Sequence, residues 1–108
     1  AILWYKKAIK EAPYLRDPYV ELALLYHKLN KNNKVIYYTN KALSIKNKDM
    51  TYINEIFSWD NTIYDIRSIA FYNIGKYKAS LKNINIAISM DKTNERLINN
   101  KKIIERNI

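Results

Sequence analysis

The side chains that usually carry out chemistry in proteins are few and scattered in this sequence. Cysteine is absent and histidine occurs once, at His27, so disulfides, thiolate zinc sites and multi-histidine metal clusters are excluded. The carboxylates number ten and are spread along the chain, and Asp60 with Asp65 is taken as the candidate pair. Five residues apart at the start of an expected helix, these two are interpreted as a cap and as a groove or ion-pair residue.

Sequence motifs for phosphate binding and nucleophilic catalysis are also missing. The chain has one glycine, Gly75, which excludes a glycine-rich phosphate loop, and it has no Gly-x-Ser-x-Gly or His-Glu-x-x-His pattern. We therefore expect no catalytic residues, no metal and no cofactor in this chain. Its function should then consist of binding.

The net charge of +9 raises the alternative of nucleic-acid binding. Most of this charge is lysine, whereas arginine, which suits bidentate phosphate and base contacts, occurs only at positions 16, 67, 96 and 106. The chain is also rich in Lys, Asn, Ile and Tyr, whose codons are rich in A and T, so a biased genome would produce the same charge. We favour a solvated lysine surface and no nucleic-acid partner. The alternative predicts binding that weakens steeply with salt.

The hydropathy of the chain predicts no membrane-spanning segment, because no apolar run approaches the required length. The first residues, Ala-Ile-Leu-Trp, do not resemble a secretory leader. A cytoplasmic location is the expectation.

An internal repeat is visible at offsets of 34 and 45 residues. At an offset of 34, Ala8 and Ile9 align with Ala42 and Leu43. At an offset of 45, the aligned pairs are Tyr19 with Tyr64, Ala23 with Ser68, Tyr26 with Phe71, Leu29 with Ile74, Asn30 with Gly75, Val35 with Ser80, Ala42 with Ala87 and Leu43 with Ile88. One unit therefore occurs about two and a half times, with one insertion of 11 residues.

Each unit is predicted to form two helices, because its apolar residues recur with a helical period. Pro18 suits the first turn of a helix, and Asp17 just before it is expected to cap that helix. Gly75 is expected to end a helix in the left-handed conformation. The predicted helices are 1–12, 17–29, 34–45, 61–74, 77–90 and 95–104. The predicted organisation is one all-α domain with a second half-repeat at 1–15, a repeat at 16–49, an insertion at 50–60, a repeat at 61–94 and a capping helix at 95–108.

This pattern resembles the tetratricopeptide repeat, in which an aromatic residue, Leu-Ala, Tyr and a later Ala-Leu recur on a 34-residue period. Val35, Thr39 and Arg67 depart from the family pattern. The resemblance implies an α-α superhelix of antiparallel helix pairs with a concave groove that binds a peptide or protein. The residues that carry it are Tyr19, Leu22, Ala23, Tyr26, Ala42 and Leu43 in one repeat and Tyr64, Ser68, Phe71, Gly75, Tyr77, Ala87 and Ile88 in the next.

A narrower resemblance concerns residues 11–23. Their sequence, Glu-Ala-Pro-Tyr-Leu-Arg-Asp-Pro-Tyr-Val-Glu-Leu-Ala, is similar to one that follows the catalytic domain in bacterial family-2 glycosyltransferases with C-terminal tetratricopeptide repeats. The segment 51–59, Tyr64-Asp65 and Arg96-Leu97-x-x-Asn100 fit the same group. The family's catalytic Asp-x-Asp has no counterpart here, so no catalytic residue is carried over. The resemblance implies that the upstream catalytic domain of the same chain is the partner, and the exposed half-repeat makes a homodimer a further expectation.

The family also implies which residues line the groove, since one face of the first helix of each pair does so. For His27 taken alone, an exposed residue on a solvated helix is the favoured alternative. The groove residues obtained by this mapping and by the offset of 45 are Asp17, Val20, Leu24, His27, Lys28, Thr62, Asp65, Ile69, Tyr72 and Asn73.

The insertion is the most individual segment of the chain, because it gathers apolar residues that the repeat does not require. One interpretation is a docking surface formed by Tyr52, Glu55, Phe57 and Trp59. The alternative is a packed turn that closes one end of the groove, with Glu55 paired to Arg16 or Arg67. Two functions follow: a non-catalytic scaffold module attached to a glycosyltransferase, or a stand-alone adaptor that binds a peptide in its groove.

Overall fold

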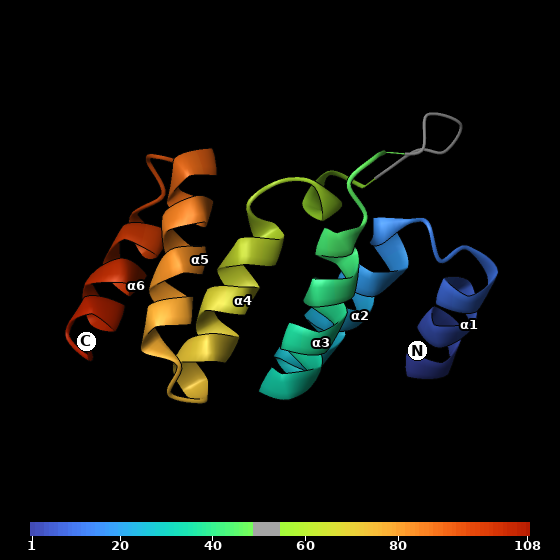
Figure 1. Cartoon of the computed structure of the whole chain (residues 1–108), viewed down its shortest axis with the longest axis horizontal. Coiled ribbons are helices and arrows are strands. Elements are labelled where there is room, and N and C mark those ends of the chain that lie inside the picture. The colour runs from blue at the N-terminus through green and yellow to red at the C-terminus, as the bar shows by residue number, and fades with distance from the viewer. Residues whose placement is uncertain (49–54) are drawn as a thin grey trace.

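The computed structural model describes residues 1–48 and 55–108, and within these ranges all regular structure is helical (Figure 1). Each α-helix lies within two residues of the span predicted from the sequence, so the all-α fold class is confirmed. The helices are α1 (Ile2–Glu11), α2 (Arg16–Lys28), α3 (Asn32–Ser44), the short 3-10 helix η1 (Ile56–Ser58), α4 (Thr62–Asn73), α5 (Tyr77–Met90) and α6 (Glu95–Glu105).

The helices stack side by side in chain order along an elongated molecule of 43 × 26 × 19 Å (Figure 1). The most extensive interfaces are those of α2 with α3 and of α4 with α5, and α3 packs on α4 between them. Helix α1 packs on α2 at one end and α6 packs on α5 at the other, while η1 contacts both α2 and α4. Helices that are adjacent in the stack are also adjacent in the chain. Each helix therefore packs mainly on the helices that precede and follow it in the sequence.

Helices α2 and α4 end in the same turn, at the positions aligned by the offset of 45. Asn30 (φ 56°) and Gly75 (φ 82°) are the described residues with a positive φ. In each turn the N–H of this residue bonds a carbonyl three residues back, at 3.1 and 3.0 Å, and the next N–H bonds a carbonyl five residues back, at 2.9 Å in both. This is the Schellman arrangement, which satisfies the last carbonyls of a helix. The left-handed conformation predicted for Gly75 is confirmed.

Replacing Gly75 by alanine should destabilise the fold by about 1 kcal/mol, because an L-residue pays that amount to adopt the left-handed conformation. A Cβ at this position meets no atom within 4 Å, so steric contact adds nothing. We expect the Tm in thermal unfolding to fall by roughly 4–8 °C. Asn30→Gly is the matched control, since it relaxes the equivalent turn. It should leave the Tm unchanged or raise it, and an equal loss in both variants would contradict this account.

The core consists of three clusters that lie between successive helices. Leu22 and Ala23 of α2 pack with Val35 of α3 and Ile66 of α4, and all four are at most 4% exposed. A second cluster joins α5 to α6, and a third joins α2, α3 and α4 beneath Phe57. Small side chains at helix crossings let the backbones approach closely.

Candidate functional site

Helix α6 is fastened to α4 by polar contacts near both of its ends. The guanidinium of Arg96 forms an ion pair with the carboxylate of Asp65 through two hydrogen bonds, one of them 3.1 Å from Nη1 to Oδ1. Hydrogen bonding to Asp65 raises the pKa of Arg96. At the other end, Nδ2 of Asn107 donates to the hydroxyl of Tyr72 at 3.2 Å. These contacts join α6 and the residues after it to α4.

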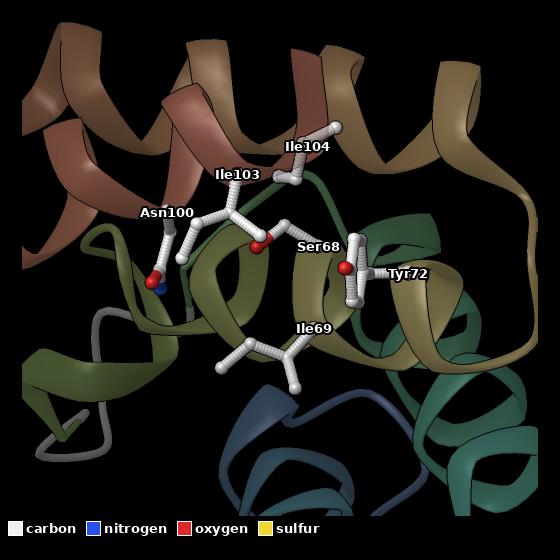
Figure 2. Close-up of a pocket in the computed structure, with 6 residues that line it drawn as sticks. All are labelled: Ser68, Ile69, Tyr72, Asn100, Ile103 and Ile104. Carbon is white, nitrogen blue, oxygen red and sulfur yellow. The ribbon is translucent and has the colours of Figure 1, made fainter. Parts of the chain in front are cut away.

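A cavity of about 240 Å³ lies between the Arg96–Asp65 ion pair and the Asn107–Tyr72 hydrogen bond (Figure 2). Asn100 and Ile103 project from α6 toward α4 (Figure 2), and Ile69 and Tyr72 are among the α4 residues that line the cavity. The hydroxyl of Ser68 donates to the carbonyl of Asp65 at 2.7 Å, so its proton is already engaged. The remaining wall is mostly carbon, so the cavity suits an apolar group of about the size of one side chain.

Only some of the α4 residues that were predicted to line the groove lie at this cavity. Ile69 and Tyr72 line it, and Asp65 holds its far wall through the ion pair. Asn73 is exposed at the end of α4, where its Nδ2 donates to Asn32 Oδ1 of α3 at 3.2 Å. Thr62 is half-buried at the start of the same helix. Residues 95–108 were expected only as a capping helix, so the contribution of α6 to this cavity was not predicted.

The residues predicted on α2 divide into exposed and buried ones. Lys28 is exposed, and Leu24 and His27 are half-buried. Asp17 is only 4% exposed and Val20 is 0% exposed, so neither offers a surface to a partner, and both are removed from the expected groove. The capping role expected of Asp17 is also wrong, because α2 begins at Arg16 with Leu15 as its N-cap residue.

Asp17 is buried and does not cap α2 because its side chain faces the insertion. Its carboxylate accepts hydrogen bonds from the hydroxyl of Ser58 and from the backbone N–H of Glu55, the latter at 3.1 Å. Arg16 is turned the same way, since its Nε donates to the carbonyl of Ile45 at 2.7 Å and its Nη1 to the carbonyl of Ser58 at 3.1 Å. The first turn of α2 thus anchors both the end of α3 and η1.

The aromatic residues of the insertion take part in this packing. Trp59 is half-buried with the Arg16 guanidinium 3.7 Å above its ring, and Phe57 packs on the cluster of Val20, Ala42 and Ile63. Tyr52, the remaining aromatic residue of the expected docking surface, lies outside the described residues. The contacts of Phe57 and Trp59 are those of a packed turn.

Two further expectations have clear outcomes. The ion pair expected between Glu55 and Arg16 or Arg67 is wrong: these three side chains are all described, and none of them pairs with another. Both arginines instead bond to neutral oxygens, and Glu55 uses its backbone. The interpretation of Asp60 as a cap is confirmed only in part: its Oδ1 accepts the N–H of Thr62, the first residue of α4, at 2.8 Å, but the N-cap residue is Asn61, which makes no side-chain capping bond.

Three carboxylates lie close together here, and they give a prediction for pH dependence. Burial, followed by repulsion from Asp17 and Glu55, raises the pKa of Glu21 above its ordinary 4.5. The folded state therefore keeps this proton at a pH where the unfolded chain releases it, and ionisation of Glu21 destabilises the fold as the pH rises above 4.5.

Glu21→Gln should consequently raise the Tm at neutral pH by about 1–5 °C and give no gain near pH 4. Thermal unfolding followed by circular dichroism across this range measures the difference. Glu105→Gln, at an exposed glutamate of α6, is the control for removing one negative charge from a basic protein. A gain for Glu21→Gln that is equal at both pH values would contradict the prediction.

Other kinds of site are not found in the described part of the chain. No group of three or more His, Cys, Asp or Glu side chains is placed there to hold a metal ion. Among the described helices, none is both long and apolar enough to cross a membrane. Comparison with protein-family models, with curated proteins and with solved structures gave no match for this chain. The fold and the cavity define an all-helical stack with a small apolar site between two of its helices.

Proposed function

We propose that the chain is a non-catalytic tetratricopeptide-type module that docks a protein partner, and that it belongs to the C-terminal part of a bacterial family-2 glycosyltransferase. The observation that carries the docking proposal is the uncovered apolar face of α1. Leu3 is 83% exposed and Trp4 is 67% exposed on this helix. On the opposite side of the helix, Ile2, Tyr5 and Ile9 pack against the core.

A helix with apolar residues on both sides is typical of one packed between two layers. Large aromatic side chains at the centre of an interface concentrate its binding energy. Around Leu3 and Trp4, the exposed lysines Lys6, Lys7 and Lys10 supply a positively charged rim, which favours a partner surface with acidic residues. The similarity of residues 11–23 to glycosyltransferases supports the upstream catalytic domain as that partner.

The first test is the upstream reading frame, which should encode about 200 residues of alternating strands and helices with an Asp-x-Asp motif. The second test adds that domain in trans to the present chain and measures association by calorimetry. Trp4→Ala should weaken binding about tenfold or more, the effect expected of an aromatic anchor. An upstream region without such a domain would refute the glycosyltransferase assignment and leave the docking surface to be tested with other partners.

The matched control for Trp4→Ala is Ile56→Ser, because Ile56 is 81% exposed on η1, away from α1. It should bind as tightly as the native chain. If Ile56→Ser abolished association while Trp4→Ala did not, docking would be assigned to the insertion. If the chain alone sedimented as a dimer that Trp4→Ala dissociates, the α1 face would be assigned to a second copy.

A second candidate function, a stand-alone adaptor for peptides, is supported by the cavity between α4 and α6. An apolar side chain of a bound peptide would enter it, as in helical grooves that capture single anchors. Binding of such a peptide should shift the NMR resonances of Ile69, Tyr72 and Ile103. Ile69→Ser should abolish the shifts of Tyr72 and Ile103 without affecting the association measured through Trp4.

A further inference from the structure

A second cavity, of about 340 Å³, lies between α3 and α5 and is also lined by residues of α4. Leu43, Phe71 and Ile86 supply apolar walls, and Arg67 with Lys82 supplies positive charge. Asn83 completes the polar side. The cavity therefore combines a carbon surface with two cations, and none of its lining residues carries a carboxylate.

Arg67 is held in this cavity by neutral groups only. Its Nε donates to Asn83 Oδ1 at 3.1 Å, and its Nη1 donates to Thr39 Oγ1 at 2.9 Å and to Asn40 Oδ1 at 2.6 Å. The acceptors are themselves fixed: Thr39 Oγ1 donates to the carbonyl of Val35 at 2.7 Å, and Asn83 Nδ2 donates to a carbonyl of its own helix. The orientation of the guanidinium is thus set before any ligand arrives.

The second terminal nitrogen of Arg67, Nη2, is available to a ligand. Among the residues that the structure describes, Nη2 has no hydrogen-bond partner, and it is not sealed from solvent. The described residues form one ion pair, between Arg96 and Asp65, so the charge of Arg67 has no carboxylate opposite it. Burial lowers the pKa of Arg67, with Tyr64 opposing the change, which is consistent with a partly desolvated cation. A partly desolvated guanidinium with free N–H donors is a strong partner for an oxyanion.

The internal repeat shows that the fold does not require a cation here. Leu22 is the residue aligned with Arg67 at the offset of 45, and it is 0% exposed in the first unit. Tyr38 aligns with Asn83, and it stacks on Tyr26 with ring centroids 5.7 Å apart. The same architectural position is therefore built from apolar and aromatic residues in one unit and from a guanidinium and an amide in the other.

We propose that the cavity between α3 and α5 binds the carboxylate of an organic anion through Arg67 and Lys82, with the apolar part of the anion packed on Leu43, Phe71 and Ile86. The carboxylate accepts from the free N–H groups of Arg67 Nη2, and Lys82 supplies the second charge. The ligand is a free organic acid or an acidic side chain of a polypeptide, which present the same chemistry to this site. The proposal is independent of docking through α1.

The test is an NMR titration of the 108-residue chain with 3-phenylpropionate, observed at the Arg67 Nε–H and at the backbone amides of α3, α4 and α5. We expect saturable shifts with a Kd on the order of 1 mM, a range typical of a small anion with one apolar ring. The neutral isostere 3-phenylpropionamide should bind at least about tenfold more weakly, because it lacks the charge. Equal shifts from the amide, or shifts spread over all surface lysines without saturation, would overturn the proposal.

Arg67→Leu places the aligned residue of the first unit at this position and should weaken binding of the acid about tenfold or more. Circular dichroism checks its helical content. Lys82→Gln leaves the Arg67 hydrogen bonds intact and should weaken binding about two- to fivefold, which keeps the proposal testable if Arg67→Leu misfolds. Lys78→Gln, at an exposed lysine outside the cavity on the same helix, should have no effect. Native affinity in either Arg67→Leu or Lys82→Gln would contradict the assignment.

A pair of short peptides distinguishes the two sources of the carboxylate. One contains glutamate beside phenylalanine, and the other has glutamine in place of the glutamate. Tighter binding of the glutamate peptide than of 3-phenylpropionate assigns the site to a polypeptide, and the reverse order assigns it to a free acid. Both results support a carboxylate site, whereas equal binding of the two peptides with no response to the free acid would refute it.

Discussion

Arg16→Ala is expected to lower the Tm by about 10–20 °C, the largest effect of any arginine substitution in this chain. Arg16 is 8% exposed, and its guanidinium joins three segments that are far apart in the sequence. It donates to the carbonyl of Ile45 at the end of α3 and to that of Ser58 in η1, and it covers the ring of Trp59.

The size of the stability loss follows from the carbonyls and the Trp59 ring that Arg16→Ala leaves without a partner. A hydrogen bond from a charged donor contributes about 1.5–3 kcal/mol, and a buried carbonyl without a partner costs about 1–3 kcal/mol. Stacking on Trp59 adds about 1 kcal/mol. Since these contributions are not additive, a total near 3 kcal/mol is expected, at about 4–8 °C per kcal/mol for a domain of this size.

Thermal and urea unfolding of Arg16→Ala measure this loss. Arg106→Ala is the control, because Arg106 is exposed beyond α6 and makes no side-chain hydrogen bond among the described residues. Its stability should stay within about 0.5 kcal/mol of the native value. A similar small change in Arg16→Ala would show that the contacts of the first turn of α2 contribute little to the fold.

Leu97→Ala is the second substitution with a large expected effect, a loss of about 2–5 kcal/mol that falls mainly on α6. Leu97 is 0% exposed and packs with Ile84, Ala87 and Ile104, so its truncation leaves a cavity between α5 and α6. Because a stacked helix depends chiefly on its neighbour, α6 should detach before the rest of the molecule unfolds. The cavity between α4 and α6 would then lose one wall.

Native-state hydrogen exchange checks this directly. Amide protection should fall in α6 of Leu97→Ala while α2 and α3 keep most of theirs. Leu3→Ala, at a leucine that is 83% exposed, should leave the amide protection of α6 and of α2 unchanged. Equal losses of protection in α6 and α2 would show instead that the stack unfolds as one cooperative unit.

Much of the fold was predictable because helices and their ends depend on local sequence. The apolar period of residues 77–90 predicted α5 to the residue. Gly75 marked a helix end because few other residues adopt a positive φ cheaply. Asn30, aligned with it, makes the same turn, which shows that the repeat offset carried structural information beyond composition.

The candidate sites were less predictable, since they depend on which distant segments meet. Ile69 and Tyr72 were placed on a binding face by the repeat, but the opposing wall of the cavity comes from α6, about 30 residues further along. The repeat mapping also assigned Asp17 and Val20 to that face, where packing of the insertion buries them. A periodic pattern specifies the face of a helix and does not specify what covers it.

By itself, then, the sequence determined the all-helical fold of the described residues, the helix bounds to within two residues, the left-handed turn at Gly75, and the absence of cysteine and of a second histidine. The tertiary structure alone decided the partners of Arg16 and Arg67. Arg16 binds carbonyls 29 and 42 residues away, and Arg67 binds oxygens 27 and 28 residues away. Helix formation is governed by contacts within a few residues, whereas the burial and partners of a charge depend on packing between segments that the local pattern does not specify.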